Sequence, residues 1–393
     1  MTLANAHALF YGLKADPSFL ASLTVPEGER KALMDARQEI REELKAAASY
    51  IITQDEYWQP GSVQRSAIRN RPPIQIKFMT QGSFSYKTLN VPARRRVQEI
   101  DLDDGMYVPI DYLENGEPAL VAKGLYDFVE KTLASLCKRR GWKLDTTKEC
   151  CVRVKLWEGA HIDLPIYSIP RDRFVQLRES MARTATASMT YDSVKGDWKL
   201  PSDKIMLAQR DGKWVQSDPQ QLHDWVEGRV ERYGAVYRRL SRFFKGWRDF
   251  TWERSKLSSL CLMCAVDLAL RQLDGLPTEN RDDELVLEVA KRLPDILNGK
   301  IMNPVLGHLC INEWDNEVRG EILEGAEKLR IQMIAALERT GDAEQVVLKL
   351  RARFGHRIPY RPDVVTISST ISAIEKAPAQ TVAAPRVIPT TSG

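Results

Sequence analysis

Apolar residues recur every three or four positions along much of this chain, which is the spacing of one face of an α-helix. Residues 26–52 show this pattern with Glu, Lys and Arg in between, and Pro26 suits a first helical turn. The apolar positions of that segment are Leu33, Ala36, Ile40, Leu44, Ala47 and Ile51. Residues 120–140 are predicted to be helical as well. From about residue 218 onward, helices are predicted almost without interruption, at 219–233, 235–250, 257–273, 282–294 and 316–340.

Strands are predicted only in the first half of the chain. Residues 72–83 and 97–110 lead into and out of a Gly-Ser turn, and residues 150–156 and 161–167 are predicted to form a hairpin across Glu158 and Gly159. An α/β half therefore precedes an α-helical half. Residues 376–393 are rich in Pro, Ala and Thr, so they are predicted to form a flexible tail that buries too little apolar surface to offset its ordering entropy.

The composition is that of a soluble globular protein with more than one domain. The chain has 393 residues, 43% hydrophobic and 28% charged, which favours two domains plus extensions. The net charge of +4 is too small to imply polynucleotide binding by itself. No segment approaches the ~20 apolar residues of a membrane span, and the N-terminus lacks the features of a secretory signal. The scattered cysteines suit a reducing compartment, so we expect a cytoplasmic protein.

The clearest chemical signal is a pair of carboxylates that follows the Gly-Ser turn. Asp101 and Asp103 lie two apart on a predicted strand, so they share one face while Leu102 enters the core. Adjacent carboxylates repel one another unless a divalent cation lies between them. The best third carboxylate is Asp163, on a strand that can pair beside the first. A lone Asp-x-Asp is commonly a solvated strand edge, but this combination predicts a metal-bound nucleoside triphosphate.

Residues near the carboxylates have narrower predicted roles. Gly82 permits close backbone approach, and Ser83 offers its hydroxyl and backbone N–H to the terminal phosphates. Asp104 alternates away from the pair and is expected to cap a turn at Gly105. His161 shares a strand face with the third carboxylate, where it either contacts the site or makes a structural hydrogen bond.

Two basic segments and a cysteine pair leave alternatives open. Residues 94–96 are three consecutive arginines that could bind phosphate but more often form a solvated loop. Residues 238–248 combine Arg and Lys with Phe and Trp at helical spacing. Such a helix could bind phosphate or nucleic acid, although a surface helix with an aromatic core face is the preferred interpretation. Cys261 and Cys264 have zinc-site spacing but no second ligand pair, so structural thiols are predicted.

Six blocks of sequence occur in order along the chain: 79–86 (MTQGSFSY), 99–109 (EIDLDDGMYVP), 161–170 (HIDLPIYSIP), 212–219 (GKWVQSDP), 242–249 (RFFKGWRD) and 354–357 (FGHR). Together they resemble the bacterial cGAS/DncV-like nucleotidyltransferases, and most closely the branch of the DncV cyclic GMP-AMP synthases. The resemblance implies an α+β fold, with a polymerase-β-like nucleotidyltransferase core, an α-helical second lobe and the active site in the cleft between them. We therefore expect the core at residues 1–200, including the long N-terminal helix, the helical lobe at 201–360 and the tail at 361–393.

The resemblance also implies an activity and its cofactors. Enzymes of this branch join ATP and GTP into 3′,3′-cyclic GMP-AMP and release two pyrophosphates, with two Mg²⁺ ions in the active site and Mn²⁺ as a possible substitute. The product would activate an effector protein in the anti-phage defence system CBASS. Neither a membrane nor a nucleic acid is expected to be required.

The resemblance also implies the site residues. The catalytic and metal-binding positions are Asp101, Asp103 and Asp163. The positions that match contacts to the donor nucleotide are Gln81, Ser83 and Tyr86. Those that match triphosphate contacts from the helical lobe are Lys245 and Ser259. The positions expected near a base or sugar are Arg153, Ser217 and Asp218.

Two further features concern the base selectivity and the C-terminus that the resemblance implies. Members of this branch use an acidic residue to help select guanine, whereas residues 300–312 contain no carboxylate here, so base selectivity stays open. Gly393 is expected to offer an exposed carboxylate to an E1/E2-like conjugating enzyme, the alternative being an ordinary disordered terminus. The rival functions are a synthase of another cyclic oligonucleotide, a template-independent polymerase and a non-catalytic nucleic-acid-binding protein.

Overall fold

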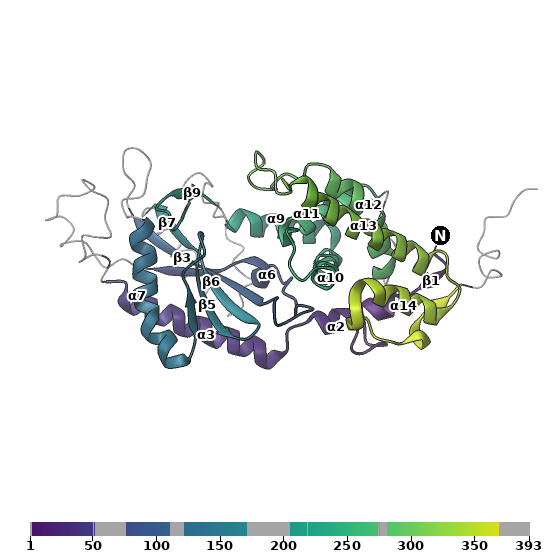
Figure 1. The fold of residues 1–393 in the computed structure, drawn as a ribbon, viewed down its shortest axis with the longest axis horizontal. Helices are drawn as coiled ribbons and strands as arrows, with labels where there is room; N and C mark the ends of the chain where they lie inside the picture. Colours follow the sequence, from purple (N-terminus) through teal and green to yellow (C-terminus); the bar gives the residue numbers. More distant parts are fainter. Residues whose placement is uncertain are drawn as a thin grey trace, which may run out of the picture.

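The computed structural model describes residues 2–49, 51, 76–110, 122–170, 205–217, 219–273, 275 and 281–368. Figure 1 shows a twisted sheet at one end of the molecule and a group of helices at the other. We call these parts the sheet lobe, built from β2–β9 with α3 and α7, and the helical lobe, built around α9–α14. Their order along the chain matches the predicted sequence of an α/β half and a helical half.

Strand β3 (Ile100–Ile110) lies at the centre of the sheet. Its first half pairs in parallel with β6 (Ala160–Leu164) and its second half pairs in parallel with β7 (Ile166–Pro170). A single strand was predicted at 161–167, and Pro165 divides it into these two strands. The described strands run in the order β4-β5-β6-β3-β7-β8-β9, and β2 also pairs with β3. Their bounds are β2 (Lys77–Thr80), β4 (Lys143–Asp145), β5 (Val152–Trp157), β8 (Met206–Ala208) and β9 (Trp214–Gln216). The predicted hairpin is present as β5 and β6.

Helices α3 (Glu27–Ala47) and α7 (Ala122–Arg140) share one hydrophobic core with the sheet. The predicted apolar face of α3 is buried in it, and Leu102 of β3 is fully buried in the same core. Because side chains alternate along a strand, the two neighbours of Leu102 emerge on the opposite face. Because one face of β3 packs against the core, the side chains on its other face are the ones available to form a site.

The helical lobe is organised around α10 (Val236–Thr251), whose apolar face carries Phe243, Phe244 and Trp247, all fully buried. This confirms an aromatic core face rather than an aromatic binding surface. The other helices are α9 (Pro219–Tyr233), α11 (Ser259–Arg271), α12 (Asp282–Asn298), α13 (Asn316–Leu337) and α14 (Ala343–Phe354). Cys261 and Cys264 are free thiols buried within α11, as predicted. None of the helices in the described part of the chain is long and apolar enough to cross a bilayer.

The N-terminal residues belong to the core of the helical lobe. Helices α1 (His7–Phe10) and α2 (Phe19–Leu23) pack against α10 and α12. Strand β1 (Ala4–Asn5) pairs with β10 (Thr366–Ile367) near the other end of the described chain, beyond the short helices η4 (Gly355–Arg357) and η5 (Pro362–Val364). The chain therefore starts in one lobe and crosses to the other through α3. The predicted boundaries at residues 200 and 360 stay a prediction.

The role predicted for Asp104 is wrong. Strand β3 does not turn at Gly105 but continues to Ile110. The side chain of Asp104 is fully buried on the α3 side of the strand, where Nε of Arg41 donates to its Oδ2 over 2.7 Å. Its carboxylate is therefore one half of a buried ion pair that ties α3 to the sheet. The sequence correctly placed it on the face away from Asp101 and Asp103.

Candidate functional site

The register between β3 and β6 brings the predicted carboxylates together. Asp103 lies opposite Asp163, and Asp101 lies opposite His161. One ligand atom from each of Asp101, His161 and Asp163 lies within 4.8 Å of the others. The predicted pairing of the two strands is therefore confirmed. The cluster also includes His161, for which the sequence left two roles open, contact with the site or a structural hydrogen bond.

Asp103 points toward the turn before α6 (Gly82–Ser85). A Cβ atom on Gly82 would lie only 1.9 Å from Oδ2 of Asp103, and the φ angle of Gly82 is +61°, so any side chain there would be strained and would displace that carboxylate. Burial raises the pKa of Asp103 well above its ordinary value, and the charges of Asp101 and Asp163 reinforce the shift. A divalent cation would offset this repulsion, which supports the predicted use of the site.

His161 lies between two carboxylates. Its Nδ1 is 2.6 Å from Oε2 of Glu99, and its Nε2 is 3.0 Å from Oδ1 of Asp101. Its side chain is only 5% exposed. Burial lowers the pKa of His161, but the neighbouring carboxylate of Asp101 more than offsets this, and the net pKa is raised. Glu99 is a site residue that sequence reasoning missed, although it alternates with Asp101 within the strand predicted at 97–110.

Arg153 faces the third carboxylate from β5. Its Nε and Nη2 each donate to one oxygen of Asp163 over 2.7 Å. This two-fold contact follows from the register, which places Arg153 opposite Asp163 on antiparallel strands. Arg153 thus lies at the site, as expected, and its contact with a base or sugar stays a prediction.

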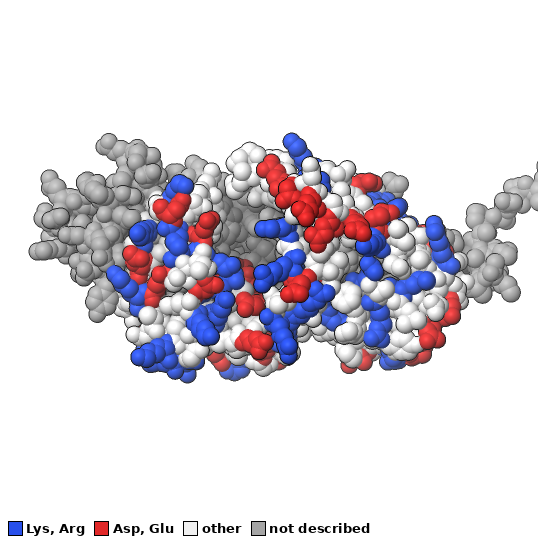
Figure 2. Space-filling view, in the orientation of Figure 1, with Lys and Arg blue, Asp and Glu red and all other residues white. Residues whose placement is uncertain are grey.

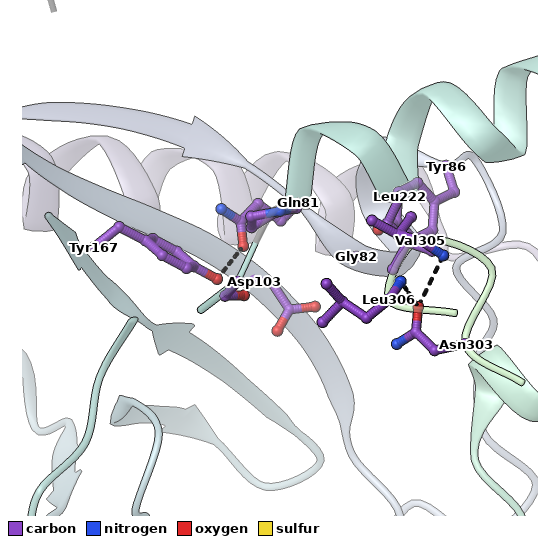
Figure 3. A pocket seen from close by; sticks show the side chains of 11 residues that line it. Gln81, Gly82, Tyr86, Asp103, Tyr167, Leu222, Asn303, Val305 and Leu306 are labelled. Carbon is purple, nitrogen blue, oxygen red and sulfur yellow. Dashed lines mark hydrogen bonds between the residues drawn. The ribbon is translucent and has the colours of Figure 1, made fainter. Parts of the chain in front are cut away.

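A pocket of about 260 Å³ opens beside Asp103. Figure 3 shows that the sheet lobe supplies Gln81, Asp103 and Tyr167, whereas a loop after α12 supplies Asn303, Val305 and Leu306. The remaining lining residues are Gly82, Tyr86, Ser217, Pro219 and Leu222. Four predicted nucleotide contacts therefore line one pocket between the lobes: Gln81, Gly82, Tyr86 and Ser217.

The walls of this pocket are held by tyrosines that sequence reasoning missed. Nε2 of Gln81 donates to the hydroxyl of Tyr107 over 2.7 Å, and Oε1 of Gln81 accepts from the hydroxyl of Tyr167 over 3.2 Å. The two tyrosine rings stack, with centroids 4.8 Å apart. Alternation along β3 and β7 could have indicated their shared face. The contribution of the loop at 303–306 could not be seen in the sequence, because it depends on how α12 packs.

Lys245 and Ser259 lie on the helical-lobe side. Lys245 is buried on α10, and its Nζ donates to the carbonyl of Thr88 over 2.8 Å. Burial, with a smaller effect of Arg248, lowers the pKa of Lys245 to about 8. Nη1 of Arg248 donates to the hydroxyl of Ser259 at the start of α11 over 3.0 Å. Ser83 is the second residue of α6. Their phosphate contacts stay predictions, and Asp218 and Gly393 lie outside the described residues.

The basic residues of α10 are engaged within the protein. Arg238 pairs with Glu227, Arg239 pairs with Asp282, and Arg242 donates to the side chain of Asn90. In the view of Figure 2, Asp and Glu gather over the upper part of the helical lobe, and elsewhere Lys and Arg are mixed with Asp and Glu. Internal pairing removes the main support for a nucleic-acid-binding role.

The cluster of carboxylates fits a divalent ion. Oδ1 of Asp101 and Nε2 of His161 are buried, and neither has a hydrogen-bond partner of acceptable geometry among the described residues. Oxygen-rich clusters of this kind are typical of Mg²⁺ and Mn²⁺ sites.

Comparison with known proteins agrees with the site. Residues 76–167 match the family described as Cyclic GMP-AMP synthase DncV-like, nucleotidyltransferase domain, and residues 234–367 match Cyclic GMP-AMP synthase, C-terminal domain. A cyclic GMP-AMP synthase of Escherichia coli (strain TW11681) is 33% identical over 325 residues, which are 78% of this chain and 72% of that protein. One of Vibrio cholerae serotype O1 is 31% identical over 323 residues, 77% of this chain and 72% of that protein.

A solved structure is similar over almost the whole chain. It is a variant of the Vibrio cholerae di-nucleotide cyclase (DncV) in complex with ATP, GTP and 5MTHFGLU2. The two align with a TM-score of 0.77 and 25% identity, over 94% of this chain and 100% of that one. The expected fold, a polymerase-β-like core with a helical second lobe, is thereby confirmed. The chain belongs to the DncV-like family of cyclic GMP-AMP synthases, and it is a nucleotidyltransferase that uses a divalent metal.

Proposed function

We propose that this protein joins ATP and GTP into 3′,3′-cyclic GMP-AMP. The 3′-hydroxyl of one nucleotide attacks the α-phosphate of the other, pyrophosphate leaves, and a second transfer closes the ring. The observation that carries the proposal is the β3–β6 register, which places Asp101, Asp103 and Asp163 beside a pocket lined by both lobes. Relatives named cyclic GMP-AMP synthase, and a DncV structure that contains both nucleotides, support the choice of substrates.

The residues divide the work of holding the substrates. Asp101, Asp103 and Asp163 would hold two Mg²⁺ ions, which when bound supply charge neutralisation at the triphosphate and activation of the attacking hydroxyl. Gly82 lets the backbone approach the phosphates closely because it has no side chain. Lys245, on the other lobe, offers a positive charge to the triphosphate.

The base of the donor fits the pocket between the lobes. Tyr86 supplies an aromatic face, and Leu222 and Leu306 supply apolar surface, all three lining the pocket. Ser217 and Asn303 provide polar groups at its edges. Stacking on apolar and aromatic walls with a few polar contacts is typical of nucleotide pockets. The guanine in the product rests on the resemblance and on the names of the relatives.

Incubation with radiolabelled nucleotides tests this proposal. The full chain is supplied with Mg²⁺ and with each nucleoside triphosphate alone, in pairs and all together, and the products are treated with phosphatase. We expect a short phosphatase-resistant product that needs both ATP and GTP, with two pyrophosphates released per molecule. A resistant product of other composition would indicate a different cyclic oligonucleotide, and a long polymer would indicate a polymerase. Absence of pyrophosphate release would favour a non-catalytic protein.

The biological setting is also a proposal. The product would serve as a second messenger for an effector in CBASS anti-phage defence, as the resemblance implies. Gly393 would be the point of attachment for an E1/E2-like conjugating enzyme. Both rest on the family resemblance alone.

A further inference from the structure

His161 has the surroundings of a metal ligand. Its side chain is 5% exposed and comes from β6, directly beside Asp101 in the strand register. Its Nε2 is 3.0 Å from Oδ1 of Asp101 and 3.9 Å from Oδ1 of Asp163. Neighbouring ligands around an octahedral ion with bonds of about 2.1 Å are roughly 3 Å apart. Opposite ligands around such an ion are roughly 4.2 Å apart, so the 3.0 Å separation suits adjacent ligands and the 3.9 Å separation lies between the adjacent and opposite positions.

The hydrogen bond on the other side of the ring fixes which nitrogen is available. Oε2 of Glu99 lies 2.6 Å from Nδ1, so Nδ1–H donates to Glu99. In the neutral ring, Nε2 then carries a lone pair on the edge of the ring that is nearest the two aspartates. Histidines that bind metals commonly donate their other N–H to a carboxylate in this way, which fixes both ring orientation and tautomer.

The contact between His161 and Asp101 is close, but its angles are poor for a hydrogen bond. Their facing atoms, Nε2 and Oδ1, are buried and only 3.0 Å apart, yet neither has a hydrogen-bond partner of acceptable geometry within the described residues. Buried polar atoms are normally satisfied by a partner, and a bound ion is one recognised way to satisfy those that find none in the protein. A shared ion would satisfy both atoms at once.

We propose that Nε2 of His161 binds a divalent ion directly, together with Asp101 and Asp163. The presence of an ion rests on the proposed function. The new element is a nitrogen ligand in a site whose other ligands are oxygen atoms. Imidazole suits transition-metal ions better than Mg²⁺. The ion that His161 contacts is therefore bound more tightly as Mn²⁺ than as Mg²⁺, although the site accepts Mg²⁺ as well, and Glu99 acts as a positioning residue that holds the ring.

The competing arrangement is a doubly protonated His161 that donates to both Glu99 and Asp101. In that case the ring would be a clamp for Asp101, and any ion would have oxygen ligands only. The two arrangements differ in one observable, the bonding of nitrogen to the ion. Pulsed electron paramagnetic resonance detects ¹⁴N coupled to bound Mn²⁺ and does not require turnover.

The test uses the full chain with Mn²⁺ alone, without nucleotide. We expect ¹⁴N coupling in the wild type, its loss in His161→Gln, and its retention in His356→Gln, a control at an exposed histidine. Wild-type Mn²⁺ without ¹⁴N coupling, or coupling that persists in His161→Gln, overturns the proposal, as does a chain that binds no Mn²⁺. The wild-type spectrum decides even if a variant does not fold. Because no nucleotide is used, a failure of cyclic dinucleotide synthesis would leave this result unaffected.

Two affinity measurements complete the test. Calorimetry should show tighter binding of Mn²⁺ than of Mg²⁺, and His161→Gln should reduce the Mn²⁺ affinity at least about tenfold while changing Mg²⁺ affinity less. Glu99→Gln should weaken Mn²⁺ about 10–100-fold yet keep the ¹⁴N coupling, since the ring is still present. Equal losses for both ions in His161→Gln would contradict direct ligation.

Discussion

The two sides of the cleft are built in different ways. On the sheet lobe, charged groups are positioned by strand register, so Asp103 faces Asp163 through backbone pairing alone. On the helical lobe, Lys245 and Ser259 are placed by the packing of α10 and α11, and each is held by a contact from elsewhere, at Thr88 and Arg248. The first arrangement can be read from spacing along the chain. The second depends on tertiary structure and was reached only through the family resemblance.

The largest effect should come from the sheet-lobe carboxylates. Asp101→Asn removes a charged ligand, so we expect pyrophosphate release to fall by about 10³-fold, because oxygen ligands fix the ions that stabilise the transition state. The matched control is Asp35→Asn on the exposed surface of α3, where the side chain is paired with Lys31. If the activity of Asp101→Asn stayed within tenfold of the control, the carboxylates would not have the proposed catalytic role.

Gly82→Ala should have the next largest effect. The new Cβ would lie 1.9 Å from Oδ2 of Asp103, so that carboxylate must move, and a displacement of this size can cost about 10²-fold in rate. Gly212→Ala is the matched control, since Gly212 also has positive φ, at +97°, but nothing within 4 Å of the new atom. Initial rates of the purified variants check this. Equal rates in both would show that Asp103 tolerates displacement.

Lys245 should produce a smaller effect, visible as proton uptake. Its pKa of about 8 lies below the ordinary value because of burial, so the folded protein becomes relatively more stable as pH rises from about 8 toward 10.5. A bound triphosphate would raise that pKa. Nucleotide binding at pH 8 should therefore take up a fraction of a proton, measured by calorimetry in buffers of different ionisation enthalpy.

The control for this measurement compares two lysines. Lys245→Met should abolish most of the uptake, whereas Lys213→Met, at an exposed lysine paired with Asp211, should not change it. The same proton uptake in wild type and in Lys245→Met would show that Lys245 does not interact with the triphosphate.

The sequence predicted those parts of the molecule that depend on local periodicity. The apolar face of α3 and the alternation around Leu102 are both present, because burial of one face is enough to specify each of them. The N-terminal helices were missed, since they are short and gain their stability from packing in the helical lobe. Asp104 was misjudged because its partner, Arg41, is 63 residues away.

The site residues divide in the same way, into those predicted by spacing along the chain and those positioned by tertiary contacts. The positions of the three aspartates followed from spacing, but the presence of Asn303 in the pocket did not, because its loop is brought there by the helical lobe. Glu99 and Tyr107 were also missed. Both alternate with the aspartates along the predicted strand, but each acts through another side chain, His161 or Gln81, and such a contact is not visible in a single sequence.

The most direct test of the account compares two neighbouring aspartates on β3. Asp103→Asn should abolish pyrophosphate release and, in EDTA at pH 7, raise the Tm, because the pKa of Asp103 is raised in the fold and its charge is destabilising there. Asp104→Asn should leave activity in the folded enzyme but cost about 3–5 kcal/mol of stability, because it breaks the buried pair with Arg41. The opposite pattern, or the same loss of activity in both variants, would contradict the claim that the register of β3 separates the catalytic face from the core.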